Sequence, residues 1–166
     1  MKLSQIATPA LVVDLDAMEF NLQRMAEFFA GKHAKLRPHF KNHKTPLFAW
    51  KQLRAGANGI TCATMREAEI LVRHGVDNIL IANEIAEQTI AEHLVELSRH
   101  ASVMVAIDNR NAVKDLARAR RNSKTQVEVV VDIDIGLRRC GVAPGEEALR
   151  PVCRRGRAPV PRHYGI

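Results

Sequence analysis

Long apolar runs, paired cysteines and aromatic side chains are all scarce in this 166-residue sequence. No apolar run reaches the length of about 18 residues that a membrane-spanning helix needs, and the first residues lack the apolar core of a signal peptide. The three cysteines, Cys62, Cys140 and Cys153, show neither even pairing nor the spacing of metal ligands. These absences predict a cytoplasmic protein without a membrane partner, in a compartment that keeps thiols reduced.

Aromatic residues that could stack on nucleic-acid bases are few: one Trp, one Tyr and five Phe, not interleaved with basic residues. The formal net charge of +7 is nevertheless high. It comes from the end of the chain, because residues 150–166 hold five arginines and no acid, while the 20 basic residues before them face 18 acidic ones. The sequence therefore predicts no nucleic-acid partner.

Apolar patterns alternate along the chain between the period of a strand and the period of a helix. Extended segments are predicted at 36–41, 59–64, 78–83, 102–108 and 126–134. Helices are predicted from about residue 16, where Met18, Leu22, Met25 and Phe29 recur at helical spacing, and at 46–55, 65–74, 86–99 and 110–121. Strand starts roughly 19 to 25 residues apart are typical of βα units that build a parallel sheet.

An open doubly wound sheet and a (β/α)8 barrel both satisfy this pattern. The sequence has no G-x-G-x-x-G and no P-loop, which removes the main support for a nucleotide-binding open sheet. Polar residues follow several predicted strands, where a barrel places its active site. Some of them, namely Thr64, Asp108 and Asn109, are better interpreted as helix N-caps. The prediction is an α/β fold, a partial barrel of about five βα units.

Basic residues are concentrated around Lys41. If residues 36–41 are extended, Leu36, Pro38 and Phe40 share one face, and Arg37, His39, Lys41 and His43 share the other. Nearby positive charge lowers the pKa of an amine, so a lysine in this setting is suited to Schiff-base chemistry with carbonyl compounds. The alternative is an edge strand whose charges are simply solvated.

A second group of charged residues follows the predicted strand 126–134. Glu128, Asp132 and Asp134 alternate onto one face, and a turn bounded by Gly136 and Gly141 carries two arginines. An arginine in such a turn suits an oxyanion or a phenolate, and an acid behind it can fix its orientation. By itself this pattern is common in α/β proteins.

Taken together, the motifs resemble those of a known family. Thr8–Asn21, Arg37–Lys44, Gly59–Glu69, Ile81–Glu84 and Asp134–Val142 occur in an order that resembles the D-threonine aldolase and D-serine dehydratase group. This group belongs to the alanine-racemase-like, fold type III, pyridoxal phosphate enzymes. The resemblance covers about residues 6–149 and implies the N-terminal portion of a (β/α)8 barrel, with the C-terminal β-domain missing.

The resemblance assigns roles to individual residues. It implies that Lys41 forms the Schiff base with pyridoxal 5'-phosphate, with Lys44 as the competing lysine, and that Arg139 contacts the phenolic oxygen of the cofactor. Asp132 is the candidate for orienting Arg139, the alternative being a structural surface acid. The last two candidates, His39 and His43, would tune Lys41 or shuttle protons, or else only support the residues that bind the cofactor.

Residues 150–166 depart from the family pattern. Prolines at 151, 159 and 161 oppose a helix, so we expect residues 1–149 to form the barrel part and 150–166 a tail without function, typical of an out-of-frame or truncated end. The full-length family is expected to use a divalent metal, Mn or Zn, whose ligands we expect to be absent here, and to be monomeric or homodimeric.

The implied function is that of a pyridoxal-phosphate-dependent lyase acting on a small D-amino acid. A D-threonine aldolase-like retro-aldol cleavage of D-3-hydroxy amino acids is expected, in a form that is truncated and inactive by itself. The alternatives are a D-serine dehydratase-like lyase and a non-catalytic barrel that binds the cofactor.

Overall fold

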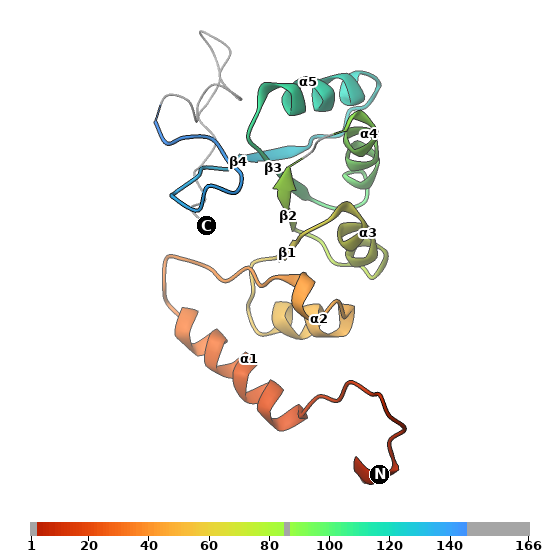
Figure 1. The fold of residues 1–166 in the computed structure, drawn as a ribbon, viewed down its shortest axis with the longest axis vertical. Helices are drawn as coiled ribbons and strands as arrows, with labels where there is room; N and C mark the ends of the chain where they lie inside the picture. Colours follow the sequence, from red (N-terminus) through yellow and green to blue (C-terminus); the bar gives the residue numbers. More distant parts are fainter. Residues whose placement is uncertain (1–2, 85–86, 146–166) are drawn as a thin grey trace.

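The computed structural model describes residues 3–84 and 87–145, and the predicted tail at 150–166 lies outside them (Figure 1). The sheet comprises β1 (Ile60–Cys62), β2 (Ile79–Glu84), β3 (Val103–Ile107) and β4 (Glu128–Val131). The α-helices are α1 (Leu15–Phe29), α2 (Pro46–Arg54), α3 (Met65–Arg73), α4 (Gln88–Leu97) and α5 (Arg110–Ala119). Three short 3-10 helices are η1 (Leu3–Gln5), η2 (Phe40–Asn42) and η3 (Arg120–Asn122).

The four strands are parallel and lie in the order β1-β2-β3-β4, each joined to the next by one helix. Figure 1 shows α2 to α5 following one another around the outside of the sheet. Every residue of β3 is buried, which is the pattern of a strand covered on both faces. The hydrophobic core fills the space between the strands and these helices, with Leu71 of α3 and Leu94 of α4 fully buried against it. This arrangement confirms the predicted succession of βα units.

The predicted strand at 36–41 is wrong, because this segment forms only one isolated bridge and then a 3-10 turn. His39 forms an isolated parallel bridge with Thr61, and the backbone N–H of Thr61 donates to the carbonyl of Pro38 at 2.8 Å. The chain then turns into η2, because the ring Nδ1 of His39 accepts the backbone N–H of Lys41 at 3.2 Å and caps the turn. Lys41 therefore lies on a 3-10 turn beyond the strand, and the alternation of faces predicted up to His43 stops at His39.

Helix starts agree with their predicted capping residues. The Thr64 hydroxyl accepts the N–H of Glu67 at 3.2 Å and caps α3. The Asn109 side chain accepts the N–H groups of Asn111 and Ala112 and caps α5. Asp108 accepts the Asn109 amide at 2.7 Å and so holds this cap in place. The interpretation of Thr64 and Asn109 as helix N-caps is confirmed, whereas that of Asp108 is wrong, because α5 is capped by Asn109.

Arg37 is directed away from Lys41, to the amino-terminal end of β2. Its guanidinium donates to the backbone carbonyl of Asn78 at 2.7 Å and to the Asn78 side-chain oxygen at 2.8 Å. Gly59, with φ +146°, lies directly under this contact, and a Cβ there would overlap both the guanidinium and the Asn78 carbonyl. Arg37 therefore ties the first extended segment to β2, and it is not part of a basic surface shared with Lys41.

The long helix α1 begins where the sequence predicts, with Asp14 accepting the N–H of Ala17 at 3.0 Å. No residue of α1 is buried. Across the described ranges, no helix has the combination of length and hydropathy that membrane crossing requires.

Candidate functional site

Polar side chains collect at the carboxyl edge of the sheet, where the four parallel strands end. His39 forms the bridge to β1 and Lys41 follows it, Glu84 ends β2, and Asp108 and Asp132 follow β3 and β4. In βα barrels this is the edge that carries the catalytic residues. The four segments that end there therefore define the candidate site.

Lys41 is exposed on η2, and its backbone is held by the ring of His39. Partial burial and the Lys41 ammonium lower the pKa of His39, and the carboxylate of Glu67 opposes them. Because Nδ1 of His39 accepts a backbone N–H, the neutral ring carries its proton on Nε2. The amine and the imidazole are thus neighbours on one short turn.

Glu67 is a buried acid that contacts the same turn. One carboxylate oxygen accepts the backbone N–H of Ala63 at 2.8 Å, and the other pairs with the Lys44 ammonium at 3.3 Å. The side chain of Glu67 is 8% exposed, whereas that of Lys44 is 69% exposed. Burial, followed by the charge of Glu67, raises the pKa of the Cys62 thiol to about 12. Cys62 is therefore an inert core residue.

His43 faces the packing between η2 and α2. Its ring makes edge contacts with Phe40, at 5.3 Å between centroids, and with Phe48, at 5.7 Å. Nδ1 accepts the backbone N–H of Thr45 at 3.1 Å, and Nε2 lies 3.3 Å from the Gln52 side-chain oxygen. Burial lowers the pKa of His43, against the hydrogen bonds to Gln52 and Thr45. The ring therefore holds the turn against α2 as a neutral donor and acceptor.

The lowered pKa values of His39 and His43 predict a loss of stability in acid. Each ring keeps its neutral form to a lower pH in the folded chain than in the unfolded chain, where the pKa is about 6.5. The stabilising contribution is therefore complete above that value and is lost as the pH falls through the lowered folded pKa values. We expect the urea midpoint to fall between about pH 7 and about pH 5, and to fall less in His43→Gln. The exposed His33→Gln is the control, which should retain the wild-type slope. A midpoint that stays level or rises in acid would contradict this prediction.

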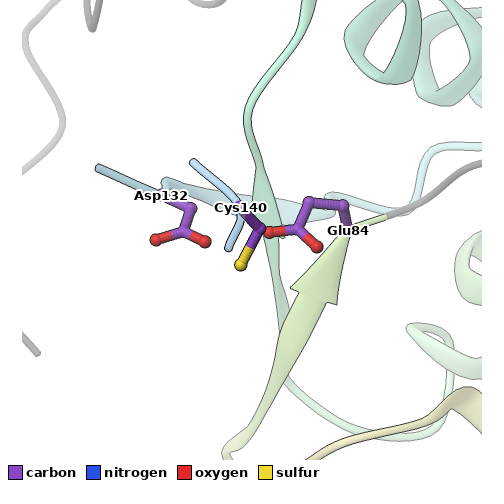
Figure 2. Close-up of side chains that lie close together, drawn as sticks. All are labelled: Glu84, Asp132 and Cys140. Carbon is purple, nitrogen blue, oxygen red and sulfur yellow. The ribbon is translucent and has the colours of Figure 1, made fainter. Parts of the chain in front are cut away.

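Three side chains that could bind a metal ion lie close together beside the carboxyl ends of β2 and β4 (Figure 2). Glu84 comes from the end of β2, and Asp132 and Cys140 come from the segment that follows β4. One donor atom from each lies within 4.8 Å of the others, and all three residues are half-buried. Burial and a hydrogen bond with Asp132 raise the pKa of Glu84. Two carboxyl groups this close share a proton or attract a cation.

The segment after β4 folds back on itself to bring these groups together. Asp134 accepts the N–H groups of Gly136 and Arg138, both at 2.9 Å, and these bonds lower the pKa of its carboxyl. The backbone N–H of Val142 donates to the carbonyl of Asp132 at 3.0 Å. Gly141 has φ +92°, and a Cβ there would meet the Asp134 backbone nitrogen at 2.8 Å. The turn therefore requires glycine at this position.

Arg139 belongs to that turn and directly precedes Cys140. A hydrogen bond with the Cys140 thiol and the nearby charges of Glu84 and Asp132 raise the pKa of the guanidinium. In return Arg139 favours the Cys140 thiolate, but the carboxyl groups of Asp132 and Glu84 and the burial outweigh it and raise the pKa of the thiol. Asp132 therefore acts on Arg139 through its charge. Glu84 and Cys140, which the sequence analysis did not select, act on Arg139 as well.

Glu67, Glu84 and Cys140 are the site residues that sequence reasoning missed. Glu67 stands three positions after Thr64, which is the spacing of a capping box. Cys140 directly follows the selected Arg139, and Glu84 ends the Ile81–Glu84 motif, of which no residue was selected. Carboxylate and thiolate groups are ligands that Zn²⁺ accepts, so Glu84, Asp132 and Cys140 are the described residues that could hold a metal ion.

Comparison with known proteins adds three findings. The family model described as alanine racemase, N-terminal domain, matches residues 13–160. The D-threonine aldolase of Arthrobacter sp is 37% identical over 141 residues, which is 85% of this chain and 37% of that protein. The 3-hydroxy-D-aspartate aldolase of Paracoccus denitrificans (strain Pd 1222) is 32% identical over 165 residues, 98% of this chain and 43% of that protein.

Among solved structures, that of D-threonine aldolase from Filomicrobium marinum superimposes with a TM-score of 0.86 and 42% identity. The match covers 89% of this chain and 40% of that one. The chain thus spans 37% and 43% of the length of the two curated relatives above.

Proposed function

Because the chain belongs to the family of alanine racemase N-terminal domains, we propose that it binds pyridoxal 5'-phosphate and contributes the lysine of a lyase that acts on D-3-hydroxy amino acids. The observation that carries the proposal is the exposed amine of Lys41, presented on a short turn at the carboxyl edge of a parallel sheet. The names of the two aldolase relatives support the substrate class, and favour aldol cleavage over dehydration.

The residues at this edge fit an anionic aldehyde cofactor. Lys41 offers a primary amine for the covalent link, and Arg139 offers a guanidinium that suits the phenolate oxygen of the ring. When bound, pyridoxal phosphate supplies an electron sink for the carbanion left by bond cleavage. The protein's part is to present the amine, to hold the ring and to keep water out.

The remaining site residues have supporting roles in this proposal. His39 holds the backbone of Lys41 and, as a neutral ring with its proton on Nε2, donates that proton at the edge where substrate would bind. His43 fixes the turn from behind through its contacts with Phe40 and Gln52. Asp132 keeps the Arg139 guanidinium at the edge by its charge.

A chimera tests the proposal. Residues 6–145 of this chain would replace the matching part of the Filomicrobium marinum D-threonine aldolase, and the product would be assayed for glycine and acetaldehyde from D-threonine. We expect the chimera to release both in equal amounts, and the same chimera with Lys41→Ala to release neither above background. The 166-residue chain alone, assayed beside it, is expected to be inactive, because in the described residues β4 ends the sheet without a further neighbouring strand.

A chimera that folds and carries the cofactor on Lys41, but forms neither acetaldehyde from D-threonine nor pyruvate from D-serine, would refute the lyase assignment and retain the binding site. Dehydration would show itself differently, as pyruvate formed from D-serine. Folding is checked by circular dichroism, and the position of the cofactor by borohydride reduction and peptide mapping.

A further inference from the structure

We propose that Glu67 is a positioning residue that withdraws Lys44 from the cofactor and thereby selects Lys41 as the reactive amine. The inference rests on the proposed function, because it concerns which amine of the Arg37–Lys44 segment binds the aldehyde. It is carried by an ion pair that joins the start of α3 to the turn that follows the first extended segment.

Two amines stand close together on this turn and are chemically equivalent. Lys41 lies within η2, and Lys44 follows it by three residues at the end of the same turn. The backbone N–H of Lys44 donates to the carbonyl of Phe40 at 2.8 Å, and its φ of +48° is in the left-handed region. This conformation ends the turn and sends the Lys44 side chain toward α3. Without a further constraint, both amines could reach an aldehyde at the carboxyl edge.

Glu67 supplies the constraint because its carboxylate is buried and is held by a hydrogen bond from the backbone of Ala63. It stands in the first turn of α3, where the Thr64 hydroxyl accepts its backbone N–H and its own side chain accepts the N–H of Ala63. This reciprocal cap leaves the second carboxylate oxygen directed at the Lys44 ammonium, 3.3 Å away. A buried carboxylate requires a cation, and Lys44 is the one that it contacts.

Lys41 lies outside this pair. Within residues 3–84 and 87–145, no carboxylate forms an ion pair with its ammonium. Its charge helps, after burial, to lower the pKa of the half-buried His39 ring. The ion pair holds the Lys44 ammonium at the Glu67 carboxylate, so Lys44 must break this contact before its nitrogen can approach an aldehyde. Lys41 breaks no ion pair of the described residues, and the approach of its nitrogen is therefore favoured.

The chemistry at stake is a condensation that balances without another reactant. The Lys41 nitrogen attacks the aldehyde carbon, water leaves, and a carbon–nitrogen double bond replaces the carbon–oxygen one. Borohydride then delivers hydride to that bond and makes the attachment permanent, so the position of the label reports which amine reacted.

The test compares the wild-type chain with Glu67→Gln, which keeps an oxygen for the Ala63 N–H and loses the charge. After exposure to pyridoxal phosphate, borohydride reduction and peptide mapping, label on Lys41 and Lys44 is divided by the mean label on the exposed Lys114 and Lys124. We expect the Lys44 to Lys41 ratio to rise about fivefold in Glu67→Gln, the effect of losing an ion pair with one exposed partner. The matched control is Glu69→Gln, two positions along the same helix, which should keep the wild-type ratio.

A double variant separates selection from simple structural support. Glu67→Gln with Lys44→Met should again carry label on Lys41 at the wild-type level, because the freed competitor is gone. If Glu67 only stabilised the fold, Lys41 label would fall in both variants and Lys44 label would not rise. An unchanged ratio in a folded Glu67→Gln would overturn this inference while leaving the proposed function intact. Absence of label on Lys41 in the wild-type chain would instead overturn the proposed function.

Discussion

Replacement of Lys41 by alanine is expected to abolish the covalent attachment of pyridoxal phosphate at the carboxyl edge of the sheet. The proposal assigns the link to this amine alone, and alanine leaves no nucleophile on η2. Label on the peptide that contains residue 41 should fall from the largest in the map to zero, and the visible absorption of the bound cofactor should disappear with it. Titration with pyridoxal phosphate, followed by borohydride reduction and mapping, measures both.

Lys114→Ala is the matched control for this variant. Lys114 is exposed on α5, so its loss should remove only background labelling and leave the absorption unchanged. The exposed position of Lys41 makes a folding defect in Lys41→Ala unexpected, and circular dichroism checks this. Full absorption in Lys41→Ala, with label moved to Lys44, would assign the link to Lys44 and refute the proposed role of Lys41.

Replacement of Phe40 by alanine should produce the largest loss of stability at the site. Phe40 is 1% exposed and belongs to the core cluster, and its ring supports His43 through an edge contact. Deleting a buried phenyl ring costs about 3–5 kcal/mol, a large part of the roughly 5–15 kcal/mol that a domain has in total. Urea unfolding followed by circular dichroism gives the change directly.

The same substitution at an exposed phenylalanine isolates the effect of burial. Phe20 of α1 is 64% exposed, and Phe20→Ala should change the unfolding free energy by no more than about 0.5 kcal/mol. Because Phe40 precedes Lys41, a folded Phe40→Ala should also carry less label on Lys41. Equal stabilities for the two variants would show that η2 is not anchored in the core.

The predicted fold class is confirmed by the family match and by the superposition with the aldolase structure: an α/β fold, and part of a barrel of the alanine racemase N-terminal domain type. Helical spacing and capping residues were sufficient for α3 and α5, because a cap is a contact between residues two or three positions apart. The strand at 36–41 failed for the opposite reason. The alternation of Leu36, Pro38 and Phe40 fits both a full strand and an extended segment that turns at His39. The hydrogen bond from the backbone N–H of Lys41 to the His39 ring favours the turn, and the sequence pattern does not show this bond.

The sequence motifs were sufficient to identify the segments that form the candidate site. They did not show which residues of these segments contact one another. Lys41, Arg139 and Asp132 were chosen from sequence, and the structure places them on segments at the carboxyl edge of the sheet. The sequence analysis did not select Glu84 and Cys140, which share a cluster with Asp132. No spacing rule connects residues on β2 with residues after β4, because their distance depends on strand order.

By itself the sequence determined the repeating βα units, the helix caps and the motif that contains Lys41, since each of these depends on neighbours within a few positions. Only the tertiary structure decided that Arg37 binds Asn78, that His43 packs against α2, and that Glu67 pairs with Lys44. The contacts of Arg37 with Asn78 and of Glu67 with Lys44 join segments that are distant along the chain and are brought together by the parallel strands, whereas His43 packs against a helix that begins three residues later. The register of the strands decides which charged and polar groups lie next to each other. Once such a group is buried, separating it from its partner costs free energy.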